Sequence, residues 1–283
     1  MRGIISPVKT YSVTLGTKTL AQSTEILPGF GALEGLLLEL TVSVSGATDS
    51  VTSETIDNVI ASLQLDDRAG KSAMDIFGTD IAIVQRVLST TGYALVAPAI
   101  TTDASGAGSA TYNTFVACTM SAADMNGSLK VKFAAASSLE NTAMTSAGTV
   151  TVTLVVRAVN TNASKQTMRI KATSPAFQTG ENAWGSYLPA GLECLALFVN
   201  LNGCVLDYAS LYSGGAALYQ QSPIDDFTVM DELFQQGSSS TGYLYFRVPV
   251  FPIDSTTVLS VNLTSTSNGP RLYSFATAPQ KRS

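Results

Sequence analysis

The most constraining feature of this 283-residue sequence is a stretch that occurs twice. Residues 71–93 and 221–243 align without a gap at an offset of 150 positions and share eight identical residues. Average residue usage predicts only about one or two matches over such a window. A second echo, at an offset of 159, aligns residues 33–38 with residues 192–197. Two echoes in the same order predict a tandem duplication that places two similar domains in one chain. The repeat positions that we single out are Phe77 and Phe227, Gly92 and Gly242, and Tyr93 and Tyr243.

Each half of the chain is long enough to build a β-sandwich core. The polar stretch 159–166 shows no pattern of regular structure and is the natural linker. We therefore predict an N-terminal domain of residues 1–160 and a C-terminal domain of residues 161–283.

Alternation of apolar and polar residues with a period of two dominates both halves. In the segment 149–154, for example, Val150, Val152 and Leu154 would face a core and the threonines the other side. Strands that are this short and numerous, separated by Gly, Asn, Ser and Pro clusters, indicate an all-β sandwich or barrel. The predicted strands are 11–15, 36–44, 59–65, 93–96, 112–119, 130–133, 149–154, 168–172, 192–200, 204–208, 243–250, 257–263 and 271–275.

Helical patterns are few, and they fall at the same place in each copy of the repeat. Residues 75–88 keep their apolar side chains roughly on one face, and residues 225–235 are their counterpart. We expect one short helix there in each half, with Phe77 and Phe227 buried where the helix packs on its domain.

Charged residues make up only 13% of the chain, against about 25% in an average protein. Such a neutral surface suits a protein whose sides are buried against neighbours, because interface centres are depleted of charge. The other interpretation is a secreted all-β protein with Ser/Thr-rich loops. The net charge of −5 argues against a nucleic-acid-binding body. Basic residues near the two ends would form small inward-facing arms or solvated tails. They are Arg2, Lys9, Lys18, Lys281 and Arg282.

Few residues offer chemistry. The chain has no histidine, which excludes Ser-His-Asp and Cys-His catalysis and His-ligated zinc. Three cysteines show no metal spacing, and Cys194 and Cys204 lie in apolar runs that suggest small core residues. No secretory signal peptide and no apolar run of membrane-spanning length is visible. We predict no catalytic residue and no cofactor.

Acidic pairs are the remaining candidates for a site. Asp66 and Asp67, like Asp225 and Asp226, could bind calcium together with backbone carbonyls, or serve glycoside hydrolysis. A simpler interpretation makes the first pair part of a polar hairpin turn and the second the start of a helix. We favour the simpler interpretation and predict no metal.

Trp184, the single tryptophan, stands in a Gly-rich segment close to Tyr187. This pair could stack on a saccharide or anchor a protein contact, and a role in the core fits equally well.

The tandem all-β units, the helix in each and the neutral surface resemble one family: the double jelly-roll major capsid proteins of tailless icosahedral double-stranded DNA viruses, of the membrane-containing bacteriophage type. The segment 239–252, Ser-Ser-Thr-Gly-Tyr-Leu-Tyr-Phe-Arg-Val-Pro-Val-Phe-Pro, followed by 255–263, is similar to the aromatic- and proline-bearing strand and the core strand of that family. Residues 93–98 are the weaker counterpart in the first half. The resemblance covers nearly the whole chain and is architectural.

The resemblance implies two tandem eight-stranded jelly rolls, each with one short inserted helix, in a pseudo-hexagonal homotrimer that tiles an icosahedral shell. It implies a structural protein and not an enzyme, located in the virion after synthesis in the host cytoplasm. Its partners would be copies of itself and neighbouring trimers, with minor capsid, penton or membrane proteins beside them and no sequence-specific nucleic acid. The alternatives are a carbohydrate-binding adhesin or fibre domain built on jelly rolls, and a β-sandwich glycosidase.

Overall fold

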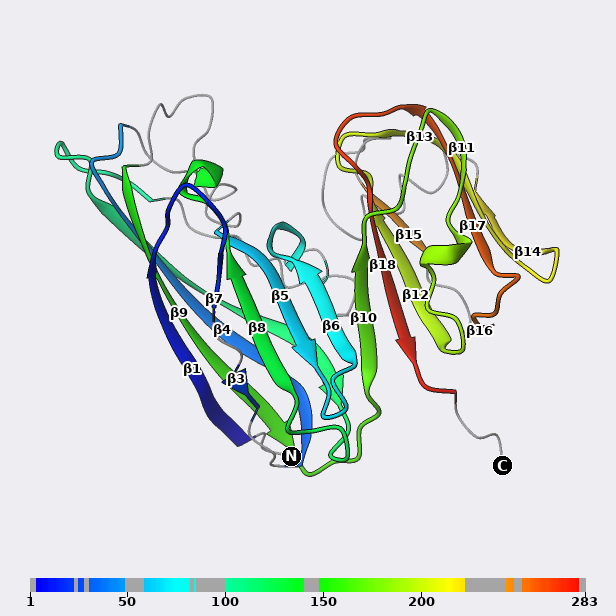
Figure 1. The fold of residues 1–283 in the computed structure, drawn as a ribbon, viewed down its shortest axis with the longest axis horizontal. Helices are drawn as coiled ribbons and strands as arrows, with labels where there is room; N and C mark the ends of the chain where they lie inside the picture. Colours follow the sequence, from blue (N-terminus) through cyan, green and yellow to red (C-terminus); the bar gives the residue numbers. More distant parts are fainter. Residues whose placement is uncertain are drawn as a thin grey trace. The chain divides into compact units, whose positions relative to one another are not determined.

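The computed structural model describes residues 4–22, 25–27, 31–48, 59–81, 84, 100–139, 148–221, 243–246 and 251–279. The chain is nearly all β and divides into two compact units, Met1–Thr167 and Met168–Ser283 (Figure 1). The division lies seven residues after the boundary expected at 160/161. Residues 159–161 belong to a strand and not to a linker, because they pair with neighbouring strands on both sides.

The first unit contains two antiparallel sheets. One sheet has the order β1-β9-β4-β7, and its strands are β1 (Ile4–Thr14), β9 (Thr149–Thr161), β4 (Ala32–Ser45) and β7 (Gly108–Met120). The other has the order β6-β5-β8, with strands β6 (Ser72–Phe77), β5 (Ile60–Asp66) and β8 (Ser128–Phe133). Two short strands, β2 (Leu20–Ala21) and β3 (Glu25–Ile26), pair with the free edge of β8.

The second unit repeats this plan. Its first sheet has the order β10-β18-β12-β15, with β10 (Met168–Thr173), β18 (Arg271–Thr277), β12 (Glu193–Asn200), β15 (Tyr243–Phe246) and the short β16 (Phe251–Pro252) beside β12. Its second sheet has the order β11-β17-β13-β14, with β11 (Gly180–Ala183), β17 (Val258–Ser265), β13 (Val205–Ser213) and β14 (Ala216–Gln221).

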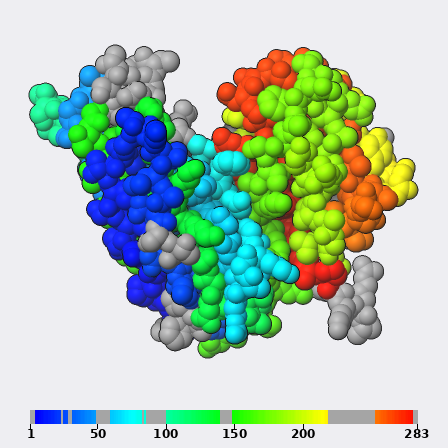
Figure 2. All heavy atoms as spheres, viewed as in Figure 1, coloured from blue at the N-terminus to red at the C-terminus, as the bar shows by residue number. Residues whose placement is uncertain are grey.

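The two units have the same strand order when each is read from its own first strand. In the first unit β1 pairs with β9, β9 with β4, and β4 with β7. In the second unit β10 pairs with β18, β18 with β12, and β12 with β15 in the same way. The echo between residues 33–38 and 192–197 falls on the equivalent strands β4 and β12. The fold is therefore two tandem jelly rolls (Figure 1 and Figure 2), and most of the shorter echo lies on equivalent strands of the two.

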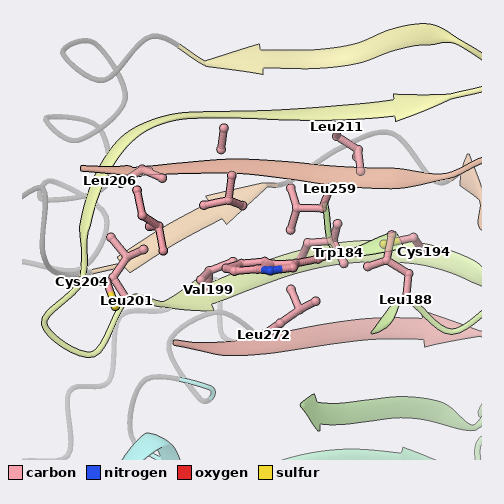
Figure 3. Packing of buried hydrophobic residues seen from close by; sticks show 14 of the residues in the cluster. Trp184, Leu188, Cys194, Val199, Leu201, Cys204, Leu206, Leu211, Leu259 and Leu272 are labelled. Carbon is pink, nitrogen blue, oxygen red and sulfur yellow. The ribbon is translucent and has the colours of Figure 1, made fainter. Parts of the chain in front are cut away.

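The alternation of apolar and polar residues along the strands explains which side chains form the two cores. On β4 the side chains of Leu36, Leu38, Leu40 and Val42 are buried, whereas the residues between them are partly exposed. In the second unit, Trp184 lies at the centre of a cluster of leucine, valine and cysteine side chains from both sheets (Figure 3). Each fully buried aliphatic side chain stabilises the fold by about 1.5–3 kcal/mol, so such clusters determine which face of each strand points inward.

The expected helix over residues 75–88 begins later than predicted. Residues up to Phe77 form strand β6, paired with β5, and a 3-10 turn follows at Gly78–Asp80. Hairpin pairing with β5 supplies backbone hydrogen bonds that outweigh the weak helical periodicity of this segment. Ile81 and Val84 are helical, and the other residues of the predicted range from 82 to 88, like residues 225–235, lie outside the described residues. Among the described helical segments, none is long and apolar enough to cross a bilayer.

Candidate assembly surface

The outer face of the sheet β1-β9-β4-β7 is regular and rich in hydroxyl groups over about half of its length. Cross-strand neighbours on this face are Ser or Thr on all four strands at two successive levels. The side chains of Thr41 and Thr111 are hydrogen-bonded at 2.8 Å, and those of Ser43 and Ser109 at 3.0 Å. These levels comprise Ser12, Thr14, Ser43, Thr41, Ser109, Thr111, Thr151 and Thr153. Such ladders satisfy their own polar groups and carry no charge that a protein partner would have to desolvate.

The charges near this sheet are compensated in pairs within the chain. The Arg157 guanidinium lies 3.2 Å from the Glu39 carboxylate, between β9 and β4, and Lys165 lies 3.3 Å from Glu34. All four residues are about one-third exposed. Pairs of this kind add little to stability at a surface. However, neither charge of such a pair is left uncompensated when another protein surface covers it.

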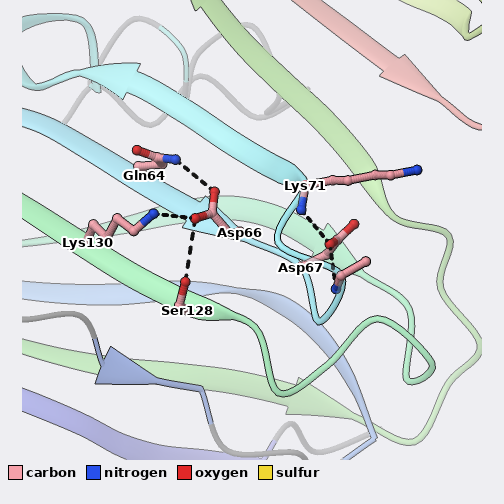
Figure 4. Close-up of polar contacts among 7 residues, drawn as sticks. Gln64, Asp66, Asp67, Lys71, Ser128 and Lys130 are labelled. Atoms are coloured by element: carbon pink, nitrogen blue, oxygen red, sulfur yellow. Dashed lines mark hydrogen bonds and ion pairs between the residues drawn. The ribbon is translucent and has the colours of Figure 1, made fainter.

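Asp66 and Asp67 occupy the β5–β6 hairpin and serve different partners (Figure 4). The buried Asp66 carboxylate accepts hydrogen bonds from Lys130 at 2.6 Å and from Gln64 at 2.8 Å. The Asp67 carboxylate accepts two backbone N–H groups of the turn, at 2.8 and 2.9 Å. The predicted polar turn is confirmed. The two carboxylates do not converge on a shared cation, and the described residues contain no group of three acidic, cysteine or histidine ligands. Asp225 and Asp226 lie outside the described residues.

The residues of the longer echo are only partly described. Phe77 ends β6 and is half-buried, so its expected burial beneath a helix is wrong. The Phe77 side chain lies on the outward face of β6. The buried positions of this strand are occupied by Ala73, Met74 and Ile76. Tyr243 begins β15, of whose side chains nothing is described, and the remaining positions of this echo lie outside the described residues: Gly92, Tyr93, Phe227 and Gly242.

Trp184 belongs to the core, which decides between the two roles considered for it. Its side chain is 1% exposed, and its indole N–H donates to the carbonyl of Ala176 at 2.9 Å. The Tyr187 hydroxyl accepts the backbone N–H of Ala176 at 3.0 Å. The indole ring is therefore not available to stack on a saccharide. A shallow hollow of about 340 Å³ beside it is lined by Phe177, Gln178, Glu181, Ala183, Ser186 and Tyr187 among others.

The three cysteines are buried and unpaired. Burial raises the pKa of both Cys118 and Cys194 to about 12. These thiols therefore stay protonated at neutral pH and behave as core residues, as the apolar context of Cys194 and Cys204 suggested.

The basic residues near the ends are described only in part. Lys9 forms an ion pair with Glu25 at 2.8 Å, and Lys18 is exposed. Arg2, Lys281 and Arg282 lie outside the described residues.

Some outward positions of the sheet β1-β9-β4-β7 are apolar, among them Leu37. The sequence did not lead us to predict this, although one signal was present. Leu36, Leu37 and Leu38 are consecutive, so an antiparallel strand must turn Leu37 to the face opposite the core. A large apolar residue at such a position is typical of a strand with both faces covered.

No protein-family model matches the sequence, and no curated protein is similar to it in sequence. Solved structures are similar in fold. The major capsid protein of STIV has a TM-score of 0.65 at 11% identity, and the match covers 98% of each chain. VP54 of PBCV-1, fitted into a reconstruction of the virophage Sputnik, has a TM-score of 0.61 at 10% identity, covering 97% of this chain and 93% of that one. The major capsid protein of bacteriophage PM2 has a TM-score of 0.51 at 11% identity, covering 97% and 99%. The chain therefore has the double jelly-roll fold of these viral major capsid proteins.

Proposed function

We propose that this chain is a structural protein, the major capsid protein of a tailless icosahedral virus, and that it assembles with copies of itself into the virion shell. The observation that carries the proposal is the likeness in fold to STIV, PBCV-1 and PM2 capsid proteins over almost the entire length of each chain. A match over both domains supports a shared role more strongly than a match to one jelly roll, since single jelly rolls serve many functions.

The finer form of the proposal is a homotrimer. Three copies with two jelly rolls each present six similar units around a ring, which gives a pseudo-hexagonal block able to tile a shell. The low charge of the chain supports wide contacts between copies, because little desolvation opposes them. The partners are other copies, neighbouring trimers, and minor capsid, penton or membrane proteins of the same particle.

A catalytic role has no support from the residues. The chain lacks histidine, and the Asp66 carboxylate is engaged by Lys130. Burial of Trp184 removes the aromatic platform that a carbohydrate-binding role would use. We expect no glycosidase or esterase turnover above that of an Asp66→Asn variant.

Multi-angle light scattering of the purified chain at micromolar concentration tests the proposal. The expected mass is three times 29.5 kDa. A monodisperse monomer that no added nucleic acid, lipid or neighbouring capsid component converts into a larger assembly would contradict the proposal.

A further inference from the structure

The outer face of the sheet β1-β9-β4-β7 changes character along its strands. Beyond the hydroxyl levels lies one mixed level that contains Glu39 and Asn113, and at the next two levels every outward position is apolar except Arg157. Ile5 is 58% exposed and Phe115 is 39% exposed, although both are large apolar side chains. We name this region the apolar patch; it consists of Ile5, Leu37, Phe115, Ala117 and Val159.

One glycine allows an aromatic ring to lie over the apolar patch. A Cβ atom at Gly35 would lie 2.4 Å from the Phe115 ring, which therefore lies across the glycine on the outer face. The ring lies next to Leu37, its cross-strand neighbour. Apolar surface with an aromatic residue in it is typical of the centre of a protein interface.

One charged residue lies among the outward positions of this region. Arg157 lies between Pro7 and Leu37 in the cross-strand pairing, and its guanidinium reaches Glu39, toward the hydroxyl levels. At the opposite end Glu34 is paired with Lys165. Nucleic acids and anionic membranes are held by basic residues that are free to pair with phosphate, and these basic residues already have carboxylate partners.

We infer that the apolar patch is a contact surface between copies of this chain, with a second copy as its occupant. The inference rests on the proposed self-assembly and names the surface that carries it. An occupant with few charges fits this surface, and a chain with 13% charged residues provides such surfaces on every copy. In a closed ring of three, the facing surface on the second copy is a different one, because cyclic trimers form heterologous contacts. Contiguous exposed apolar surface with an aromatic centre and a polar rim is typical of such interfaces.

The test is a pair of substitutions, one inside the apolar patch and one on the other sheet of the same unit. Phe115→Glu places a charge in the apolar patch on β7, and Ala69→Glu places the same charge at an exposed position of the β5–β6 hairpin. Sedimentation velocity over a concentration series should show association weakened about tenfold or more by Phe115→Glu and unchanged by Ala69→Glu. Circular dichroism of both variants should match the unsubstituted chain.

The outcomes separate this inference from the proposed function. If the unsubstituted chain associates and Phe115→Glu associates equally well, the apolar patch is not a contact and the capsid role stands. If the unsubstituted chain never associates, the proposed function fails, and this inference with it.

Thiol labelling provides a second measurement that does not depend on a disruptive charge. The native cysteines are buried, so a thiol introduced by Phe115→Cys or Ala69→Cys supplies the fast signal. The thiol from Phe115→Cys should be protected in the assembled state and modified after dilution to monomer, whereas that from Ala69→Cys should be modified in both. Modification of the Phe115→Cys thiol at the same rate in the assembled and monomeric states would overturn the inference.

Discussion

Burial shifts the pKa values of single residues inside this fold more than neighbouring charges do. Tyr11 on β1 is an example: its ring packs edge-on against Phe133, with the ring centroids 6.2 Å apart, and its buried hydroxyl has no hydrogen-bond partner among the described residues. Burial, together with the negative charge of Glu25, raises the pKa of Tyr11 to about 12. An unpaired buried hydroxyl costs about 1–3 kcal/mol, so packing of the ring must outweigh that cost.

Tyr11→Phe should therefore increase stability by about 1 kcal/mol at neutral pH, since it keeps the ring and removes the hydroxyl. The unfolded hydroxyl ionises near its usual pKa of about 10, and the folded one only at about 12. The neutral hydroxyl is thus favoured in the fold, and its contribution is complete below pH 10 and is lost as the pH rises to 12. Urea unfolding of both proteins from pH 8 to 12 checks this. A pH dependence that is identical in the two would contradict it.

The cysteines lead to a second prediction at this scale. With the pKa of Cys118 and Cys194 at about 12, almost no thiolate exists at pH 8. A thiol-specific reagent should modify the native chain at least about a hundredfold more slowly than the urea-unfolded chain. Rapid modification of any native cysteine would show that its segment opens readily or that it is not buried.

At the scale of elements, close backbone approaches fix the loops. Gly127 precedes β8 and lies against the β5–β6 hairpin, where a Cβ atom would come within 1.9 Å of the Asp66 carbonyl oxygen. Gly127→Ala must therefore displace the hairpin, and we expect a loss of about 2–3 kcal/mol. Gly16→Ala is the matched control, because nothing lies within 4 Å of a Cβ there. Thermal unfolding should show a clear fall in Tm for Gly127→Ala and little change for Gly16→Ala.

The strands were predictable from the sequence because alternation reflects which side chains are buried. Segments such as 149–154 and 36–44 show it, and both lie inside strands. The helix predicted for residues 75–88 started too early because Ile76 and Phe77 fit a helical period. These two residues pair with β5 and therefore belong to a strand. Periodicity describes a segment alone, and hydrogen bonding to a neighbouring strand overrides it.

The longer echo does not keep its register across the two units. Tyr243 begins β15, whose topological counterpart is β7, and β7 begins at Gly108 and not at Tyr93. Phe227, 150 positions after Phe77, lies outside the described residues. The loops of the two jelly rolls differ in length, so one offset cannot hold across several elements.

At the scale of the whole molecule, the account predicts assembly through neutral surfaces. The ion pairs Arg157–Glu39 and Lys165–Glu34 close within one chain, so the charges on this face of the sheet are already compensated before a partner binds. Self-association should therefore change little between about 50 mM and about 500 mM salt, over which exposed charge attraction is largely screened. Sedimentation at both salt concentrations measures this. Dissociation of the oligomer at high salt would show that charge, and not apolar contact, holds the copies together.

The basic ends belong to the same scale. We expect Arg2, Lys281 and Arg282 to face the interior of the shell, where nucleic acid or anionic lipid would meet them. Trypsin added to intact particles should leave both ends uncut, and should remove them from dissociated subunits. Rapid cleavage in intact particles would reverse the orientation and leave the capsid role in place.

Electron cryo-microscopy of particles that contain this chain is the direct test of the proposed capsid role. We expect a shell tiled by pseudo-hexagonal blocks, each with three copies of the chain and two jelly rolls per copy. A shell built from another protein, with this chain absent or present only as isolated monomers on its surface, would contradict it.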